Sequence, residues 1–101
     1  MEKNLVAKTI LEQLGGQKFI VMTGAKNFFY VGSNGLTFKI GRNKTRANTI
    51  VIKLNSKDLY DMELYRIDRN ANEFKISEAN DVYCDQLQEI FTSETGLYTS
   101  L

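Results

Sequence analysis

The middle of the chain is a succession of short segments that are rich in β-type residues or that alternate apolar and polar residues. Alternation predicts half-buried strands, because successive side chains of a strand point to opposite faces of its sheet. The connections suit hairpins and are too short for the helical crossovers that parallel strands need. The sequence therefore predicts an antiparallel sheet of about five strands. The segments assigned to it are 28–31, 36–40, 50–54, 60–65 and 74–76.

Two local signals refine this sheet. Residues 19–22 form a continuous apolar run, Phe-Ile-Val-Met, which is typical of a strand covered on both faces. The pair Asn34-Gly35 lies between β-type segments, and both residue types tolerate a positive φ. We therefore expect a type I′ hairpin turn at Asn34-Gly35.

Helical spacing of apolar residues is found at both ends of the chain. The first stripe predicts a helix over residues 3–14, ended by Gly15-Gly16, and the second predicts one over 81–94, with Asn80 or Asp81 as its cap. We expect both helices to cover one face of the sheet, giving a single two-layer α+β domain over residues 1–101. An apolar tail is expected to fold back on that domain: Leu97, Tyr98 and Leu101.

Composition excludes several functions. The chain of 101 residues has no histidine and only one cysteine, Cys84, so it lacks the usual general base, a disulfide and a cysteine-based zinc site. No apolar run reaches the roughly 18–20 residues of a membrane span. A secretory signal is also not seen, and a single free cysteine suits a reducing compartment, so we expect a cytoplasmic protein. We also expect no metal and no cofactor.

The net charge of +1 conceals a strong asymmetry along the chain. Residues 1–54 hold nine Lys or Arg and two acids, a net charge of +7. Residues 55–101 hold four bases and ten acids, a net charge of −6. Such asymmetry is typical of a charged binding face, but neighbouring strands could also interleave the two signs in space.

The basic half contains a candidate nucleic-acid site. Aromatic residues lie one strand before a basic loop, and a sheet with this composition can stack bases and neutralise phosphates. The alternative is that the aromatics form the core and the basic residues only solvate a loop. The candidate residues are Lys26, Phe28, Tyr30, Lys39, Arg42, Lys44 and Arg46, with Phe29 between the two other aromatics.

The acidic half contains a second candidate. A continuous negative face could occupy a basic channel on another protein, whereas scattered acids would only solvate strands and helices. The residues proposed for this face are Asp58, Asp61, Glu63, Asp85 and Glu89.

Three weaker signals concern other kinds of chemistry. The glycine turn over residues 22–27 could present backbone N–H groups to an anion. The pairs Asp58/Asp61 and Asp81/Asp85 follow no calcium-loop spacing, and Cys84 lacks an identifiable base. We therefore expect no enzymatic activity.

Four stretches carry a resemblance that covers nearly the whole chain. They are residues 15–28 (containing MTGAKNF), 36–40, 59–63 and 95–101 (TGLYTSL). The chain resembles a family of small, largely uncharacterised proteins encoded by phages, prophages and other mobile elements of bacteria. The resemblance implies an accessory protein that acts inside a bacterial host cell.

Two functions are thus expected. The first is a non-enzymatic inhibitor of a host defence or nucleic-acid-handling system, similar to anti-CRISPR proteins, which would occupy a surface of a defence protein or of its nucleic acid. The alternative is direct binding of single-stranded DNA or RNA through the basic loop and the aromatic strand. An exposed edge strand also invites pairing with a second copy of the chain, which would give a homodimer.

Overall fold

The computed structural model describes residues 2–32 and 34–97, which form helices and one antiparallel sheet. The sheet is a meander in which each strand pairs with the next, from β1 at one edge to β5 at the other. In chain order the elements are α1 (Glu2–Leu14), α2 (Gln17–Thr23), β1 (Lys26–Val31), β2 (Gly35–Lys39), β3 (Thr49–Leu54), β4 (Tyr60–Ile67), β5 (Glu73–Val82), the short 3₁₀ helix η1 (Cys84–Gln86) and α3 (Leu87–Thr95).

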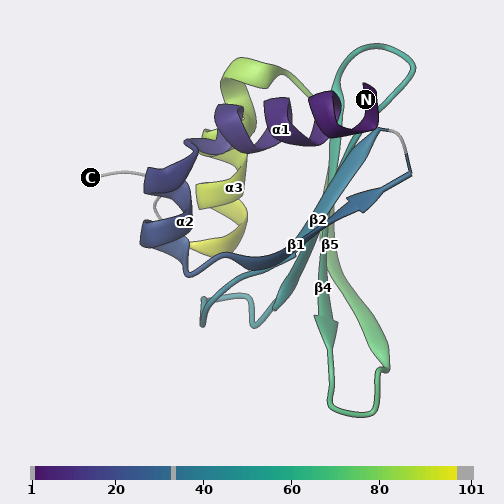
Figure 1. Ribbon diagram of the computed structural model, residues 1–101. Helices are drawn as coiled ribbons and strands as arrows, with labels where there is room; N and C mark the ends of the chain where they lie inside the picture. The colour runs from purple at the N-terminus through teal and green to yellow at the C-terminus, as the bar shows by residue number, and fades with distance from the viewer. Residues whose placement is uncertain (1, 33, 98–101) are drawn as a thin grey trace.

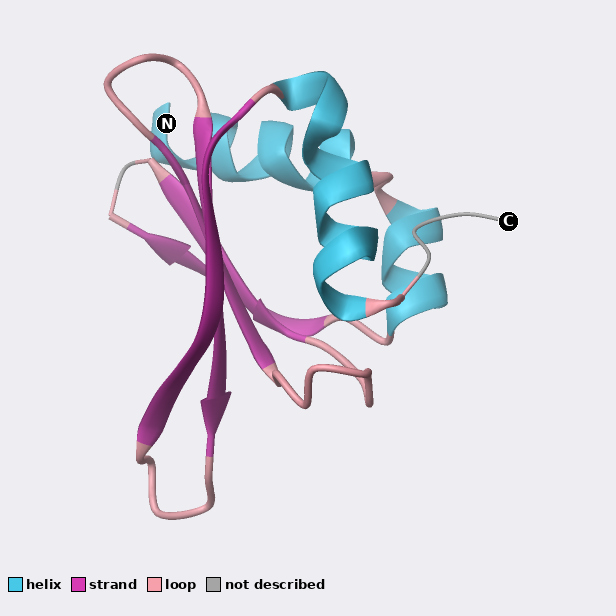
Figure 2. Cartoon of the chain, turned by 180° about the vertical axis from the view of Figure 1, so that it is seen from behind, coloured by secondary structure: helices cyan, strands magenta, loops and turns pink. Residues whose placement is uncertain are grey.

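All three α-helices lie on the same side of the sheet, and no described helix covers the other side (Figures 1 and 2). This arrangement confirms the predicted two-layer α+β fold with a helix at each end. We call the uncovered side the open face and the other the helical face.

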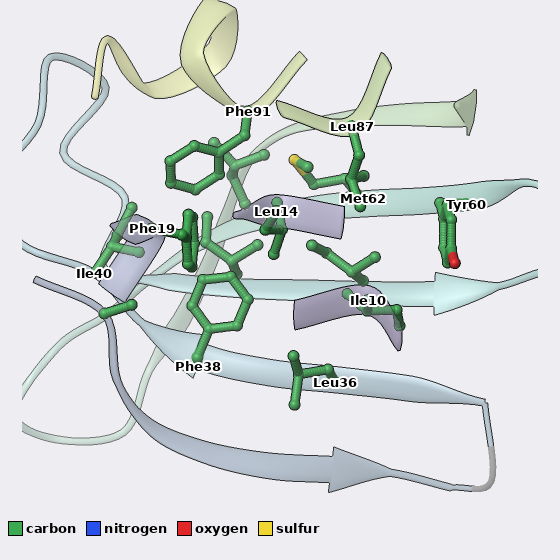
Figure 3. Close-up of a cluster of buried hydrophobic side chains, with 14 of the residues drawn as sticks. Ile10, Leu14, Phe19, Leu36, Phe38, Ile40, Tyr60, Met62, Leu87 and Phe91 are labelled. Atoms are coloured by element: carbon green, nitrogen blue, oxygen red, sulfur yellow. The ribbon is translucent and has the colours of Figure 1, made fainter. Parts of the chain in front are cut away.

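The core fills the space between the two layers. Phe19 of α2 lies between two other rings, with its centroid 5.5 Å from that of Phe38 in β2 and 5.1 Å from that of Phe91 in α3. Figure 3 shows these rings together with Leu14 and Met62, which come from α1 and β4. Apolar residues of all three helices therefore hold the sheet from one side.

The predicted strand over residues 19–22 is wrong, because this run belongs to helix α2. Phe19 and Thr23, four residues apart, are buried, whereas Val21 between them is 70% exposed. Gly24 ends the helix in a left-handed conformation, and its N–H donates to the carbonyl of Ile20. The run is so short that its one buried side could not be distinguished from a strand by periodicity.

The predicted turn at Asn34-Gly35 is also wrong. Gly35 is part of β2 and lacks a positive φ, while Gly32 adopts one, at 60°. The side-chain amide of Asn34 donates to the carbonyl of Leu54 at 2.8 Å. A Cβ at position 35 would lie 2.9 Å from Cγ of Lys53, so glycine is needed here for close strand contact.

The last strand is much longer than predicted, and the last helix begins later. β5 runs to Val82, so Asn80 and Asp81 lie in a strand and do not cap a helix. The N–H of Asp81 donates instead to the carboxylate of Asp61 at 3.0 Å. Of the predicted apolar tail, Leu97 packs on the core, while Tyr98 and Leu101 lie outside the described residues.

Candidate functional site

The open face carries a row of cationic and hydroxyl side chains across its strands. Residues directly opposite in antiparallel pairs point to the same face, so the register places them side by side. Lys26 of β1 is opposite Lys39 of β2, although two like charges in this position repel each other. The row is Lys26, Lys39, Thr49, Tyr65 and Lys75, one from each strand.

A second row on the open face is more apolar at the β1 side. Phe29 is 65% exposed and is opposite Thr37, which is followed by Val51. A shallow hollow of about 300 Å³ lies across this face. It is lined by Val31, Thr37, Thr49, Val51, Lys53, Glu63, Tyr65, Ile67 and Glu73.

The predicted aromatic strand is divided between the two faces of the sheet. Phe28 points to the helical face, where its ring centroid lies 5.3 Å from that of Phe38. Tyr30 also faces the helices and lines a groove of about 480 Å³ between α1 and β1. Only Phe29 joins the lysines on the open face, so the expectation that Phe28 and Tyr30 act beside them is corrected.

Tyr65 is an aromatic residue of the open face that the sequence analysis missed. It alternates with Leu64, which is buried on the helical face, so the period of β4 already contained this signal. Burial and then the neighbouring carboxylate of Glu63 raise the pKa of Tyr65 above its ordinary value, so its hydroxyl stays protonated near neutral pH.

The basic loop, residues 40–48, continues directly from the lysine row. Asn43 organises it with one side chain: Nδ2 donates to the carbonyls of Gly41 and Ala47 at 2.9 and 2.6 Å. Its Oδ1 accepts hydrogen bonds from the backbone N–H and the hydroxyl of Thr45. The loop is therefore held in one conformation even though its charged side chains are solvated.

Two helix ends anchor this loop. The N–H of Gly41 donates to the carbonyl of Thr23 at the end of α2, and that of Lys44 donates to Thr95 at the end of α3. The side chain of Lys44 lies against Gly96, where a Cβ would come within 3.1 Å of it. Lys44 therefore places its charge at the negative end of α3 and has a structural role in addition to any contact with a ligand.

In the part of the chain that the structure describes, charged side chains form ion pairs in the acidic half but not in the basic cluster. No acidic residue occurs between Glu12 and Asp58. Each ion pair within the described residues lies at β5, and none involves the basic cluster of Lys26, Lys39, Arg42, Lys44 and Arg46. The predicted asymmetry is therefore also spatial at this end of the sheet.

On β4 and β5 several charged side chains form ion pairs with one another. Nζ of Lys75 contacts a carboxylate oxygen of Glu78 and lies 3.2 Å from Oε2 of Glu63. Hydrogen bonds to Glu78 and then Glu63 raise the pKa of Lys75 far above its ordinary range, and the same contact lowers the pKa of Glu78. These groups are consequently engaged within the fold.

The five proposed acidic residues do not form one face. Asp61 and Glu63 point to the open face, and Asp58 lies in the turn before β4. Asp85 and Glu89 instead belong to η1 and α3 on the helical face, where they line a groove of about 690 Å³ with Glu12. The prediction of a single acidic surface is thus corrected to two separate groups.

The predicted anion site at residues 22–27 is also corrected. The N–H of Gly24 is bonded to Ile20, and that of Ala25 donates to the hydroxyl of Thr23 at 3.3 Å. This turn ends helix α2 and presents carbonyl groups, which repel anions. Lys26 therefore belongs with the lysine row.

In the candidate pairs Asp58/Asp61 and Asp81/Asp85, the carboxylates of Asp61 and Asp81 already accept hydrogen bonds, and Asp81 and Asp85 lie in different elements. Asp81 accepts a hydrogen bond from Asn55 and forms an ion pair with Lys57, each at about 3 Å. Cys84 is exposed. Among the residues that the structure describes, no three His, Cys, Asp or Glu side chains are grouped as a metal would require.

No helix within the described ranges has both the length and the apolar character needed to cross a membrane. No protein-family model, curated protein or solved structure matches the chain. The resemblance to phage and prophage proteins therefore stays a prediction.

Proposed function

We propose that this chain is a non-enzymatic binding protein that holds single-stranded nucleic acid on the basic end of its open face. The observation that carries this proposal is the opposed pair Lys26 and Lys39 beside the exposed ring of Phe29. Opposed like charges cost stability, and these lysines form no ion pair within the described residues. An external polyanion would remove that repulsion.

The exposed aromatic ring favours single strands over duplexes. A base in a duplex is stacked on its neighbours, whereas an unpaired base can stack on a phenylalanine. Phe29 is opposite Thr37, which is two residues from Lys39 on the same face of β2. A base stacked on the ring of Phe29 would therefore place its neighbouring phosphate near Lys26 and Lys39. The basic loop extends the cationic path beyond the strand ends.

Inhibition of a host defence system, the wider role implied by the resemblance, could operate through this same surface. A protein that occupies a guide or target strand would obstruct an enzyme that needs it. A second route is binding of a basic protein channel, favoured by the groove around Glu12, Asp85 and Glu89. In that case Asp85→Lys with Glu89→Lys would abolish inhibition while nucleic-acid binding persists.

Titration of labelled oligonucleotides of about 12 nucleotides tests the proposal directly. Five phosphate contacts would give a salt slope of about −3.5, or a roughly 100-fold loss of affinity between about 50 and 200 mM salt. We expect a duplex of the same length to bind more weakly. Absence of binding at low salt would overturn the proposed function.

Two matched variants locate the surface. Lys26→Gln with Lys39→Gln removes two charges from the lysine row, and Lys18→Gln with Arg69→Gln removes two exposed charges elsewhere. The first pair should lower the affinity and should make the salt slope less steep, by about 0.7 for each lost phosphate contact. The second pair should leave the slope unchanged. Equal losses in both pairs would show that binding follows net charge alone.

A further inference from the structure

A shallow hollow of about 270 Å³ lies at the basic loop, and two arginines are among the residues that line it. Arg42 and Arg46 are exposed and line this hollow together with Asn43. Neither arginine takes part in an ion pair among the described residues. Two arginines without an ion pair among the described residues therefore line one small hollow.

The walls of the hollow are held in place from several directions. Asn43 bonds both ends of the loop, and the backbone of Gly41 is tied to α2. The side chain of Asn48 fixes the far end through two hydrogen bonds with Ile67, at 2.8 and 3.0 Å. Binding at this hollow would consequently cost little ordering of the backbone.

Arg46 has a backbone conformation that is unusual for its residue type. Its φ is 66°, in the left-handed region that disfavours residues with a Cβ, and its N–H donates to the carbonyl of Asn43 at 3.3 Å. Glycine or asparagine would adopt this conformation at lower cost. The loop therefore has an arginine at a position where its backbone geometry favours other residues. This strain indicates a role for the side chain of Arg46 and not only for its backbone.

The third cation of the loop is used differently. Lys44 lies along Gly96 at the end of α3, where it complements the helix dipole. Arg42 and Arg46 have no such structural partner among the residues described. The loop thus separates one cation that stabilises the fold from two that are available to a ligand.

We propose that the hollow between Arg42 and Arg46 binds a terminal phosphate monoester of the single strand held on the open face. This inference rests on the proposed function. The planar fork of arginine binds phosphate oxygens in pairs, and two such groups match a monoester, whose charge near pH 7 is about −1.5 to −2. An internal phosphodiester has only one negative charge and would use the pair less fully.

The size and position of the hollow support this choice. The hollow is slightly smaller than the roughly 300–1,000 Å³ that is usual for pockets of whole small molecules, and it has room for a phosphate group. The loop begins at Ile40, immediately after Lys39. A strand anchored in the hollow by its end can therefore continue along the lysine pair to Phe29.

The test compares three forms of one oligonucleotide: with a 5′-phosphate, with a 3′-phosphate and with neither. We expect one phosphorylated form to bind about tenfold more tightly than the unphosphorylated form. Equal binding of all three forms would overturn the terminal-phosphate site and leave the proposed function intact. If none of the three binds at low salt, it is the proposed function that fails.

Variants assign the preference to the two arginines. Arg42→Gln with Arg46→Gln should bind all three forms alike, whereas Arg69→Gln, an exposed arginine in the β4–β5 turn, should keep the preference. Arg42→Lys with Arg46→Lys retains both charges and loses the paired geometry, so it should reduce the preference with little change in the salt slope. A preference that survives both double variants would overturn the assignment. Far-ultraviolet circular dichroism would confirm that each variant is folded.

Two further measurements complete the test. The second pKa of a phosphate ester is about 6, so the preference should weaken as the pH falls through that value. The chain contains no histidine, so no side chain with an ordinary pKa near 6 would produce this effect. A nucleoside monophosphate that binds as tightly as the phosphorylated strand would instead identify a free nucleotide as the ligand and overturn the strand-end assignment.

Discussion

The two faces of the sheet are made by the same alternating strands, but helices cover only one of them. On the helical face, Phe19 is fully buried between the rings of two other phenylalanines. On the open face, Phe29 is 65% exposed although it is paired with Thr37 in the sheet. The same residue type therefore has a structural role on one face and is available for binding on the other.

The charges repeat this contrast from one edge of the sheet to the other. Near β5, Lys75 forms ion pairs with both Glu63 and Glu78, so charged groups of opposite sign are paired within the fold. Near β1, Lys26 and Lys39 repel each other without an acid beside them among the described residues. An unbalanced charge beside an exposed ring is what distinguishes a candidate binding surface from a merely solvated one.

Phe19→Ala should have the largest effect on stability. Its ring contacts those of Phe38 and Phe91, so truncation leaves a cavity in the centre of the core. We expect the free energy of unfolding to fall by about 3–5 kcal/mol in a urea titration. A loss below about 1 kcal/mol would mean that the helices cover the sheet less closely than the structure shows.

Asn43→Ala should have the next largest effect, although the residue lies in a loop. It removes the side-chain hydrogen bonds to Gly41, Ala47 and Thr45 and leaves two carbonyls without that partner. At about 0.5–1.5 kcal/mol for each lost hydrogen bond, we expect a loss of about 2–3 kcal/mol. Unfolding by urea would measure it, and an unchanged midpoint would contradict the view of a rigid basic loop.

Phe29→Ala should weaken binding and leave stability nearly unchanged, the opposite of what is expected for Phe19→Ala. Because the ring is largely exposed, the free energy of unfolding should change by less than about 1 kcal/mol. Affinity for a single strand should fall by the value of one stacked base, about 1–3 kcal/mol. Fluorescence anisotropy would measure this loss, and Val21→Ala, at a residue that is 70% exposed on α2, is the control that should bind normally. Unchanged binding by Phe29→Ala would exclude stacking on this ring.

The fold was largely predictable from the residues because its central strands alternate over most of their length. Ile50 and Ile52 within β3, and Tyr60, Met62 and Leu64 within β4, are buried and are separated by single, less buried residues, so the period and the turns between them determine the register. The helix over residues 17–23 was not predictable in this way. Its seven residues make too few turns to show a helical period, and its direction depends on Phe19 reaching the core.

The candidate site was predictable in its residues but not in its geometry. The basic loop could be identified by charge alone, whereas the position of Lys26 on the same face as Phe29, and not on that of Phe28, depends on a bulge between Lys26 and Phe29. A bulge changes which residues point to which face, and nothing in the composition of this segment indicates one. The hollow between Arg42 and Arg46 depends on contacts of Asn43 that only the folded loop provides.

The smallest effect should be a loss of stability in acid that arises from the acidic half of the chain. The carboxylate of Asp68 accepts hydrogen bonds from the backbone of Asn72 and Asn70, which lower its pKa, and Lys75 lowers that of Glu78. A carboxyl with a lowered pKa in the folded state contributes stability above its unfolded pKa of about 4. That stability is lost as the pH falls through the folded value.

The thermal midpoint should therefore be steady from about pH 7 to 5 and should decrease below about pH 4. Asp68→Asn with Glu78→Gln should show a shallower decrease, because neither replacement titrates. The basic region cannot contribute to this decrease, since residues 13–57 contain no carboxyl side chain. If parent and variant lose stability equally, the acid response must arise from other carboxyls of the chain, and the contrast between the paired and the unpaired edge would rest on the ion pairs alone.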